Sequence, residues 1–388
     1  MNKKIPISHF RSPNPHDSNP RIAIVCDFLT TMGGAEKVVL AMHEAFPTAP
    51  IYTAIYDQEK MPEFSSLDIR TSWLQKLPKF LRKSYKLFPT LAVNAFRRLD
   101  LSEFDIILTS SYLVSNQVRK TRPDQVLISY CHTPARYYWS HYDEYRKNPG
   151  YGSLDPIIRL LIPIFVPHQR KLDYQAAQRV DLFIANSTET QKRIEKYYGK
   201  KSTIIHPPVD VSRFEPARER ADYYMTMGRQ LPYKRYDLVV AACTKLGLPL
   251  KVFGNGPDHE KIVEIAGPSI EFRTDRFGDA SDAELELALN HAKGWIYAAE
   301  EDFGIVQVEA LAAGAPVITY GKAGALDIVQ DGENGVLFHE QTVDAVCDAI
   351  QRAESIKFFP SAMQRRAKRF DKSLFITKLK KIVSDQLS

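Results

Sequence analysis

The sequence lacks any hydrophobic run long enough to cross a membrane. A spanning helix needs about 20 apolar residues, whereas the best candidate, Ile157–Val166, is shorter and contains Arg159 and Pro163. The first 20 residues are polar and rich in Pro, Ser, Asn and His, without the apolar core that an export signal requires. We therefore expect a disordered leader over residues 1–20 and a cytoplasmic protein.

Cysteine is scarce, and no metal-ligand spacing is present. The four cysteines lie far apart and form no CxxC pair, which is typical of buried, reduced thiols: Cys26, Cys131, Cys243 and Cys347. No DxD-like site or His/Asp/Glu cluster has ligand spacing. The sequence therefore predicts no metal and no bound cofactor. Gly254-Asn255-Gly256-Pro257 lacks the spacing of a dinucleotide fingerprint, which argues against an NAD-linked dehydrogenase.

Length and apolar patterning predict two α/β domains. A chain of 388 residues exceeds one ordinary core, and its short Val- and Ile-rich runs alternate with helical patterns, as in parallel sheets covered on both faces. We expect a first series of strands at 22–26, 51–55, 104–109, 126–130, 180–185 and 202–205, and a second at 224–227, 250–253, 270–272, 295–298, 317–320 and 336–338.

The pattern pauses at Pro207-Pro208, where a polar segment resembles an interdomain linker. The predicted organisation is therefore a Rossmann-like domain over 21–208, a second over 209–370, and a C-terminal helix over 371–388 that can pack back on the first domain. Ligands of doubly wound sheets bind beyond the carboxyl ends of the strands, so the cleft between the domains is the expected active site.

The residues from Trp295 to Glu309 carry the strongest chemical signal. A strand runs into an acidic turn and then into a helix that begins near Gly304, whose free N–H groups suit a phosphate or a polarised hydroxyl. Glu301 precedes this helix, and Glu309 lies within it. Taken singly, Glu301 can be a helix-capping acid and Glu309 a solvated surface residue.

As a whole, this string resembles glycosyltransferase family 4, in which a Glu, an adjacent Phe-Gly and a second Glu recur at the spacing of Glu301, Phe303, Gly304 and Glu309. The resemblance extends along nearly all of the chain past residue 20. It implies the GT-B architecture of two Rossmann-like domains, with Glu301 on the donor sugar and Glu309 on the nucleotide ribose, and with Phe303, Gly304 and Ile305 beside the donor.

The same resemblance implies two cations for the donor diphosphate. Arg229 follows a predicted strand, and Lys234 stands five residues later; fixed cations suit the negative charge that develops on a leaving diphosphate. An isolated Arg and Lys would be ordinary surface charges. Family members often have Gly after this Lys, whereas this chain has Arg235, so the turn here departs from the family's pattern.

Further candidates follow other predicted strands. Gly33-Gly34 lets the backbone approach a ligand, and Gly254 stands in a second glycine turn; the resemblance implies that both contact the donor. His132, which by itself can be a structural residue, is implied to position the sugar. Ser187 and Asp327 are weaker candidates, and Asp327 can also be a helix cap. Many relatives carry Gly-Gly and a Glu where this chain has Ala323-Gly324 and Asp327.

The segment from Trp73 to Leu99 combines apolar and basic residues at helical spacing. Its cations include Lys76, Lys79, Arg82, Lys83, Lys86, Arg97 and Arg98. The pattern fits a helix on an anionic membrane surface, and it fits equally a core-facing helix with a solvated basic side. Nucleic-acid binding is disfavoured because no recognised module accompanies the charge.

The sequence thus predicts a nucleotide-sugar-dependent glycosyltransferase. By analogy with the family, it would retain the anomeric configuration, with the leaving diphosphate assisting deprotonation of the acceptor. The strings 130–137 and 300–311 most resemble bacterial mannosyltransferases of surface-polysaccharide assembly, so GDP-mannose is the preferred donor and a glycan or lipid-linked glycan the acceptor. A UDP-hexose donor, a sugar-nucleotide epimerase and a non-catalytic sugar-nucleotide-binding protein remain alternatives. An enzyme on a lipid-linked acceptor would be peripheral on the inner face of the cytoplasmic membrane.

Overall fold

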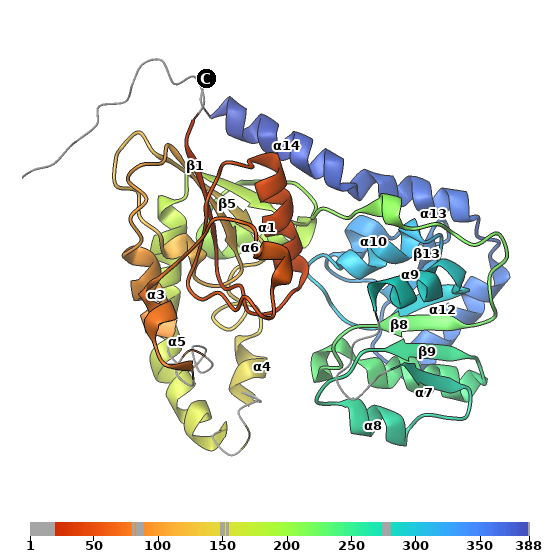
Figure 1. The fold of residues 1–388 in the computed structure, drawn as a ribbon. Helices are drawn as coiled ribbons and strands as arrows, with labels where there is room; N and C mark the ends of the chain where they lie inside the picture. The colour runs from red at the N-terminus through yellow and green to blue at the C-terminus, as the bar shows by residue number, and fades with distance from the viewer. Residues whose placement is uncertain are drawn as a thin grey trace, which may run out of the picture.

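The computed structural model describes residues 20–79, 82, 89–147, 152, 155–273 and 281–386 of the chain. Two parallel sheets of seven and six strands form the centres of two domains, as predicted (Figure 1). The first domain carries β1 (Ile22–Cys26), β2 (Ile51–Thr53), β3 (Ile69–Thr71), β4 (Ile106–Ser111), β5 (Val126–Cys131), β6 (Leu182–Ala185) and β7 (Ser202–Ile204). The second carries β8 (Tyr224–Met227), β9 (Leu250–Phe253), β10 (Ile270–Arg273), β11 (Gly294–Tyr297), β12 (Val317–Tyr320) and β13 (Gly335–Phe338).

The strand order shows where each sheet binds its ligand. The orders are β3-β2-β1-β4-β5-β6-β7 and β10-β9-β8-β11-β12-β13. In both sheets the order reverses beside the first strand of the domain, between β1 and β4 and between β8 and β11. Crevices of doubly wound sheets open at such reversals. The loops after these strands carry Gly33-Gly34 in the first domain and Arg229 and Glu301 in the second.

Helices cover both faces of the two sheets. In the first domain they are α1 (Gly34–Ala45), α3 (Pro89–Arg97), α4 (Tyr142–Lys147), α5 (Asp155–Arg179) and α6 (Thr188–Tyr198). In the second they are α7 (Tyr236–Leu246), α8 (His259–Glu264), α9 (Asp282–His291), α10 (Ile305–Ala312), α11 (Ala325–Ile328), α12 (Val343–Ser355) and α13 (Pro360–Ala367), and α14 (Lys372–Asp385) follows. Short 3₁₀ turns include η2 (Trp73–Lys76), η6 (Val211–Arg213) and η7 (Pro232–Lys234).

The predicted strands correspond to strands of the structure, and β3 is the strand that the sequence patterning missed. β3 reads Ile-Arg-Thr and is only partly buried, so it lacks the continuous apolar run that marks a strand covered on both faces. β1, in contrast, is buried along its whole length.

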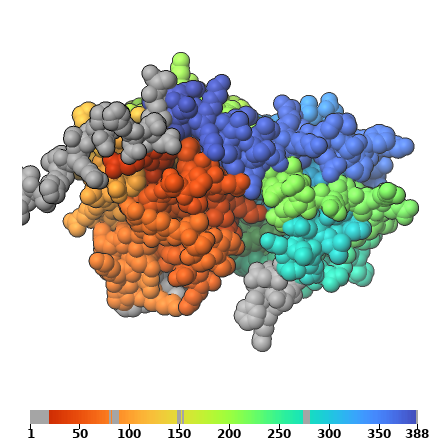
Figure 2. Space-filling view, turned by 45° about the horizontal axis from the view of Figure 1, so that its top comes forward, coloured from red at the N-terminus to blue at the C-terminus, as the bar shows by residue number. Residues whose placement is uncertain are grey.

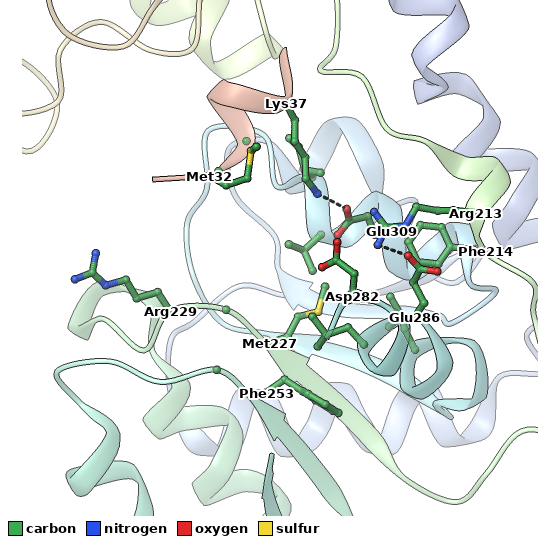
Figure 3. Close-up of a pocket in the computed structure, with 18 of the residues that line it drawn as sticks. Met32, Lys37, Arg213, Phe214, Met227, Arg229, Phe253, Asp282, Glu286 and Glu309 are labelled. Atoms are coloured by element: carbon green, nitrogen blue, oxygen red, sulfur yellow. Dashed lines mark hydrogen bonds and ion pairs between the residues drawn. The ribbon is translucent and has the colours of Figure 1, made fainter. Parts of the chain in front are cut away.

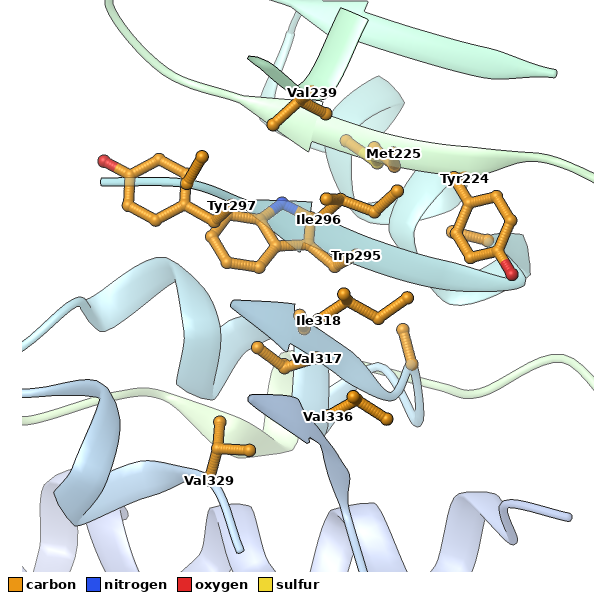
Figure 4. Packing of buried hydrophobic residues seen from close by; sticks show 14 of the residues in the cluster. Tyr224, Met225, Val239, Trp295, Ile296, Tyr297, Val317, Ile318, Val329 and Val336 are labelled. Carbon is orange, nitrogen blue, oxygen red and sulfur yellow. The ribbon is translucent and has the colours of Figure 1, made fainter. Parts of the chain in front are cut away.

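The apolar core of the second domain supports the loop that carries the acidic motif. Trp295 and Tyr297 lie side by side on β11 with ring centroids 4.9 Å apart (Figure 4). Both pack in one cluster with residues of β8, β12 and β13. The loop that begins at Ala298 therefore leaves a densely packed strand, which limits how far its side chains can shift.

The chain passes between the domains twice, and the two passages are hydrogen-bonded to each other. Val209 donates its N–H to the carbonyl of Phe370 (3.1 Å), and Lys372 donates to the carbonyl of Val209 (2.9 Å). Beyond this point α14 returns to the first domain, where Phe375 and Leu379 enter the core formed with α1. Figure 2 shows the C-terminal helices lying across both domains.

The basic segment from Trp73 to Leu99 is described only in part. Phe80, Leu81 and residues 83–88 lie outside the described residues, so the membrane-surface role of this segment stays a prediction. Leu74, Val93 and Phe96 are buried in the core of the first domain. This part of the segment therefore has the core-facing arrangement. Within the described ranges, no helix is both long enough and apolar enough to cross a bilayer.

Candidate functional site

A two-part cleft lies between the domains, at the carboxyl ends of their strands. One part is a cavity of about 640 Å³ between the Met32–Gly34 loop, η6 and the second domain. The other is a cavity of about 470 Å³ that extends from His132 to Glu301. Gly34, Gly228 and Ile305 line both, so the two cavities form one continuous groove long enough for an extended ligand.

The helix N-terminus that the sequence placed near Gly304 lies at the junction of the two cavities. Gly304 has φ +96° and is followed by Ile305, the first residue of α10. A left-handed backbone is accessible to glycine without a steric penalty, and a Cβ on Gly304 would lie only 2.6 Å from Nε2 of Gln307. The free N–H groups and the positive dipole end of α10 therefore face the groove, where they favour an anion.

Glu301 lines the second cavity and is held by one cation and one hydroxyl. Lys234 places Nζ 3.2 Å from Oε1 of Glu301, and Tyr297 donates its phenolic O–H to the same oxygen at 2.6 Å. Tyr297 belongs to the packed core of β11. The carboxylate is thus fixed in direction, with its second oxygen available to a ligand hydroxyl.

Lys234 is the last residue of η7, and Arg235 forms the turn that follows it. Arg235 adopts φ +53° and ψ +41°, the left-handed conformation that glycine favours. Ala323 has φ +51°. Among the described residues these are the non-glycine positions with positive φ, and they stand at the two places where this chain departs from the glycines of the resembled family. At both places the backbone keeps the left-handed conformation, although a residue with a Cβ adopts it with strain.

Arg229 lines the first cavity with an exposed side chain. Figure 3 shows its guanidinium pointing away from Glu309. Gly228 and Gly254 bring the two neighbouring loops together, because a Cβ on Gly254 would lie 2.3 Å from the carbonyl oxygen of Gly228. Both glycines have positive φ, so these loops follow a path that other residues would not easily adopt.

Glu309 reaches the first cavity from α10 and pairs with a residue of the opposite domain. Lys37 of α1 places Nζ 3.0 Å from Oε1 of Glu309, whose side chain is largely buried (Figure 3). The sequence reasoning did not single out Lys37. The feature that could have identified Lys37 is its position in the first turn of the helix that follows Gly33-Gly34.

The far end of the first cavity carries further charged residues that the sequence reasoning missed. Arg213 pairs with Glu286 at 2.5 Å, and Phe214 and Asp282 line the same end (Figure 3). Asp282 is the first residue of α9, whose N-cap is Ser281. This end therefore offers an aromatic ring and carboxylates, which suit a planar group with N–H donors.

Gly34 approaches α10 closely, whereas Gly33 lies against the side chain of Glu36 in its own domain. A Cβ on Gly34 would lie 3.0 Å from Cδ1 of Ile305, and one on Gly33 would lie 3.0 Å from Oε2 of Glu36. A close backbone approach between the domains therefore occurs at Gly34, and the contact of this loop with the donor stays a prediction.

His132 follows β5 and lines the second cavity. Its Nε2 lies 2.8 Å from Oγ of Ser110. Burial lowers the pKa of His132 to about 4, so the imidazole is neutral at physiological pH. A neutral imidazole can exchange hydrogen bonds with a sugar hydroxyl, whereas it carries no charge to balance a phosphate.

The weaker candidates lie outside both cavities and have structural partners. Ser187 is buried, and its Oγ accepts from the N–H of Thr190 as the N-cap of α6. Asp327 accepts from the N–H of Thr188 at 2.7 Å and lies 3.4 Å from Nε2 of His206. Burial acts to raise the pKa of Asp327, but these hydrogen bonds hold it below its ordinary value. Asp327 therefore caps a helix of the other domain.

Phe303 also packs at the junction of the domains. Its ring stacks on His206 at a centroid distance of 5.4 Å and meets Phe370 edge-on at 5.5 Å. Gly324 contacts the backbone of the same residue, since a Cβ there would lie 2.3 Å from Cα of Phe303. Phe303 thus anchors the acidic loop while also lining the second cavity.

An ion-pair network beside Glu301 joins the two domains and was missed from the sequence. Arg136 pairs with Asp302 at 2.5 Å. Arg193 of α6 donates to Asp302 and lies 3.3 Å from Oε1 of Glu300. Arg136 belongs to the string that carried the family resemblance, but Arg193 lies in an ordinary amphipathic helix without a local signal. Within the described ranges, no group of three His, Cys, Asp or Glu residues is arranged to hold a metal ion.

Comparisons with known proteins agree with this geometry. The family model "Glycosyltransferase Family 4" matches residues 32–213, and "Glycosyl transferases group 1" matches residues 210–370. A GDP-mannose-dependent alpha-(1-6)-phosphatidylinositol monomannoside mannosyltransferase of Mycobacterium tuberculosis is 28% identical over 216 residues, which are 48% of this chain and 55% of the relative. The chain thus spans about half the length of the curated relatives it matches.

Solved structures resemble the whole fold. Sucrose-phosphate synthase from Thermosynechococcus elongatus superposes with a TM-score of 0.70 at 17% identity, covering 94% of this chain and 99% of that one. Anabaena HepE in complex with UDP and glucose superposes with a TM-score of 0.66 at 16% identity, covering 93% and 99%. At such identities the likeness establishes the two-domain fold alone.

Proposed function

Because the chain belongs to glycosyltransferase family 4 and has the GT-B fold, we propose that it transfers a hexose from a nucleotide diphosphate sugar to a glycan or lipid-linked glycan, with mannose from GDP-mannose as the preferred donor. The observation that carries this proposal is the convergence of Glu301, Lys234 and the N-terminus of α10 on one groove between the domains.

The groove has the right sequence of groups for a donor of this kind. The diphosphate would lie at the N-terminus of α10, between Lys234 and Arg229, where the helix dipole and the two cations favour negative charge. Glu301 would accept from hydroxyls of the sugar, and Glu309 from the two hydroxyls of the ribose. Lys37 would keep the Glu309 carboxylate in place while leaving its second oxygen for the ribose.

Transfer with retention needs stabilisation of the leaving diphosphate more than a protein nucleophile. Lys234 and Arg229 would stabilise the charge that develops as the glycosidic bond breaks. Glu301 is held by Lys234 and Tyr297 in an orientation suited to positioning a hydroxyl. The leaving phosphate oxygen would take the proton of the acceptor hydroxyl on the same face. His132, neutral at physiological pH, would orient the sugar or the acceptor by hydrogen bonding.

Preference for a guanine base is supported by Asp282. Guanine presents two neighbouring N–H donors on one edge, N1–H and the N2 amino group, and a carboxylate can accept both at once. Uracil presents a single N–H. Asp282 lines the end of the first cavity together with Phe214 (Figure 3), where a base attached to the ribose at Glu309 would arrive. The mycobacterial relative is also named as GDP-mannose-dependent.

The test is a panel of GDP- and UDP-sugars offered with lipid-linked saccharide acceptors, following both nucleotide release and glycosylated product. Product with GDP-mannose alone supports the proposal, whereas product with only a UDP-sugar contradicts the mannose assignment. Consumption of the donor without modification of any acceptor would indicate an epimerase or a hydrolase.

Two variants sharpen this panel. Glu301→Gln should reduce transfer at least a hundredfold, since an amide is a weaker acceptor and no longer pairs with Lys234. Asp282→Asn should raise KM for GDP-mannose about tenfold, which corresponds to about 1.4 kcal/mol of lost hydrogen bonding. The exposed Glu284 on the same helix supplies the matched control, Glu284→Gln, which should leave KM unchanged.

A further inference from the structure

The first half of α5 presents a row of large apolar side chains to solvent. The exposed fractions are 59% for Ile157, 73% for Leu160, 38% for Leu161, 66% for Ile164 and 53% for Phe165. Intervals of three and four residues place these side chains on one helical face. Single exposed apolar residues are common on protein surfaces, but a contiguous group of this size marks an interaction site.

The fold holds this face outward. The rest of α5 buries its opposite side in the first domain, through Val166, Gln169, Asp173, Ala176 and Ala177. Gln169 also donates to Oγ1 of Thr90 on α3 at 2.9 Å. α4 and the first turns of α5 extend to the end of the domain remote from α14 (Figure 1).

Cations border the apolar row. A groove beside α4 is lined by Arg146, Lys147 and Arg159 together with Asp143 and Leu160. From Pro156 to Leu172 the sequence has three cations and no acidic residue. Over the longer stretch from Tyr142 to Leu172, five Lys and Arg residues stand against three Asp and Glu residues. Arg170 is turned into the domain, where it donates to the carbonyl of Tyr138. The cations that border the apolar row are therefore Arg146, Lys147 and Arg159, and Asp143 is the acid that lines the same groove.

We propose that this face of α5, with the cations of α4, docks the protein on an anionic membrane surface. An amphipathic helix with a basic border lies in the plane of the interface, its apolar side chains at the level of the acyl chains and its cations at the lipid phosphates. Ile157–Val166 is too short to span the bilayer, but an interfacial helix need not span it.

The docking surface adjoins the mouth of the cleft. Tyr145 of α4 packs on Tyr137 with ring centroids 4.1 Å apart, and both line the cavity that contains Glu301. A protein held on a bilayer by α4 and α5 would therefore bring this cavity to the depth at which a lipid-linked saccharide presents its sugar. Docking itself does not depend on sugar transfer.

The experiment is co-flotation of the full chain with vesicles of phosphatidylcholine alone or mixed with phosphatidylglycerol, without donor or acceptor. The wild type should partition onto the anionic vesicles and, less strongly, onto the neutral ones. Leu160→Gln/Ile164→Gln should lower partitioning on both at least tenfold because it removes apolar contact. Arg146→Gln/Lys147→Gln/Arg159→Gln should lower anionic binding about fivefold per cation, and added salt should do the same.

Matched controls separate the site from general surface effects. Leu287 is 61% exposed on α9 of the second domain, so Leu287→Gln should float like the wild type. Lys378→Gln/Lys380→Gln/Lys381→Gln removes three exposed cations from α14 and should also have no effect. The proposal is overturned if the wild type does not float with anionic vesicles, or if it is a dimer in solution that Leu160→Gln/Ile164→Gln converts to monomer. Because no donor is present, failure here leaves the proposed transfer reaction unaffected.

Discussion

Replacement of Arg193 by Met should destabilise the protein strongly, because Arg193 is the buried member of the network that joins the domains. The side chain of Arg193 is 7% exposed, and its guanidinium forms ion pairs with Glu189, Glu300 and Asp302. Breaking a buried ion pair costs about 3–5 kcal/mol, mainly because the remaining charge stays buried. Here Asp302 keeps Arg136 and Glu300 keeps Lys322, so we expect a loss near the lower limit, about 3 kcal/mol.

Equilibrium unfolding in denaturant measures this loss, and a double-mutant cycle assigns it. In an Asp302→Asn background the same replacement should cost only about 1 kcal/mol, because the carboxylate that Arg193 neutralises is gone. Arg193→Lys should recover part of the loss, since it restores the charge without the planar fork. Lys245→Met breaks the exposed pair with Asp344 and should change nothing measurable. A cost for Arg193→Met below about 1 kcal/mol, or additive single losses in the cycle, would refute the reasoning.

Three further outcomes follow from single contacts. Burial raises the pKa of Glu36 from 4.5 to about 7, so the folded protein holds this proton more tightly than the unfolded chain does. The wild type should therefore lose about 3 kcal/mol of stability relative to Glu36→Gln as pH rises from 4.5 to 8. Denaturant unfolding measures this loss, and parallel pH profiles of the two proteins would argue against it. Arg235→Gly should be about 1 kcal/mol more stable than Arg235→Ala, because both variants lose the guanidinium but only glycine adopts the left-handed backbone without strain. Equal denaturant midpoints for the two variants would contradict this. Gly34→Ala should reduce transfer through contact with Cδ1 of Ile305, and Ile305→Val, which removes that atom, should restore it in steady-state assays.

Most of the fold was predictable because burial on both faces leaves a local mark. β1, β4 and β12 read as apolar runs in the sequence, and the structure buries nearly every residue in them. β3 has no such mark. It forms because β2 offers an edge for pairing, with Tyr52 opposite Arg70, and pairing of this kind depends on a partner that the local pattern does not reveal.

The sequence predicts the site residues that stand in one contiguous motif, but it does not predict residues that join the site through contacts between distant parts of the chain. Glu301, Gly304 and Glu309 stand in one string, and the structure brings Lys234 to it. The partners of Asp302 and Glu309 come from residues more than a hundred positions away. Arg193 and Lys37 look like ordinary helical surface cations in the sequence. Arg193 has a local partner in Glu189, but its pairs with Glu300 and Asp302, and the pair of Lys37 with Glu309, form only when one domain packs on the other.

The acidic loop itself explains why cations from several elements converge there. Glu300, Glu301 and Asp302 are three consecutive acids in the loop after β11, and their side chains have different partners. Glu301 faces Lys234 of its own domain, while Glu300 and Asp302 face Arg193 of the other.

Without these cations the three carboxylates would repel one another. Docking of the first domain therefore neutralises the residues on both sides of Glu301. The direction of Glu301 in the groove should then depend on Arg193 even though the two do not touch. Arg193→Met should for this reason lower kcat as well as stability, and Arg193→Lys should recover both together.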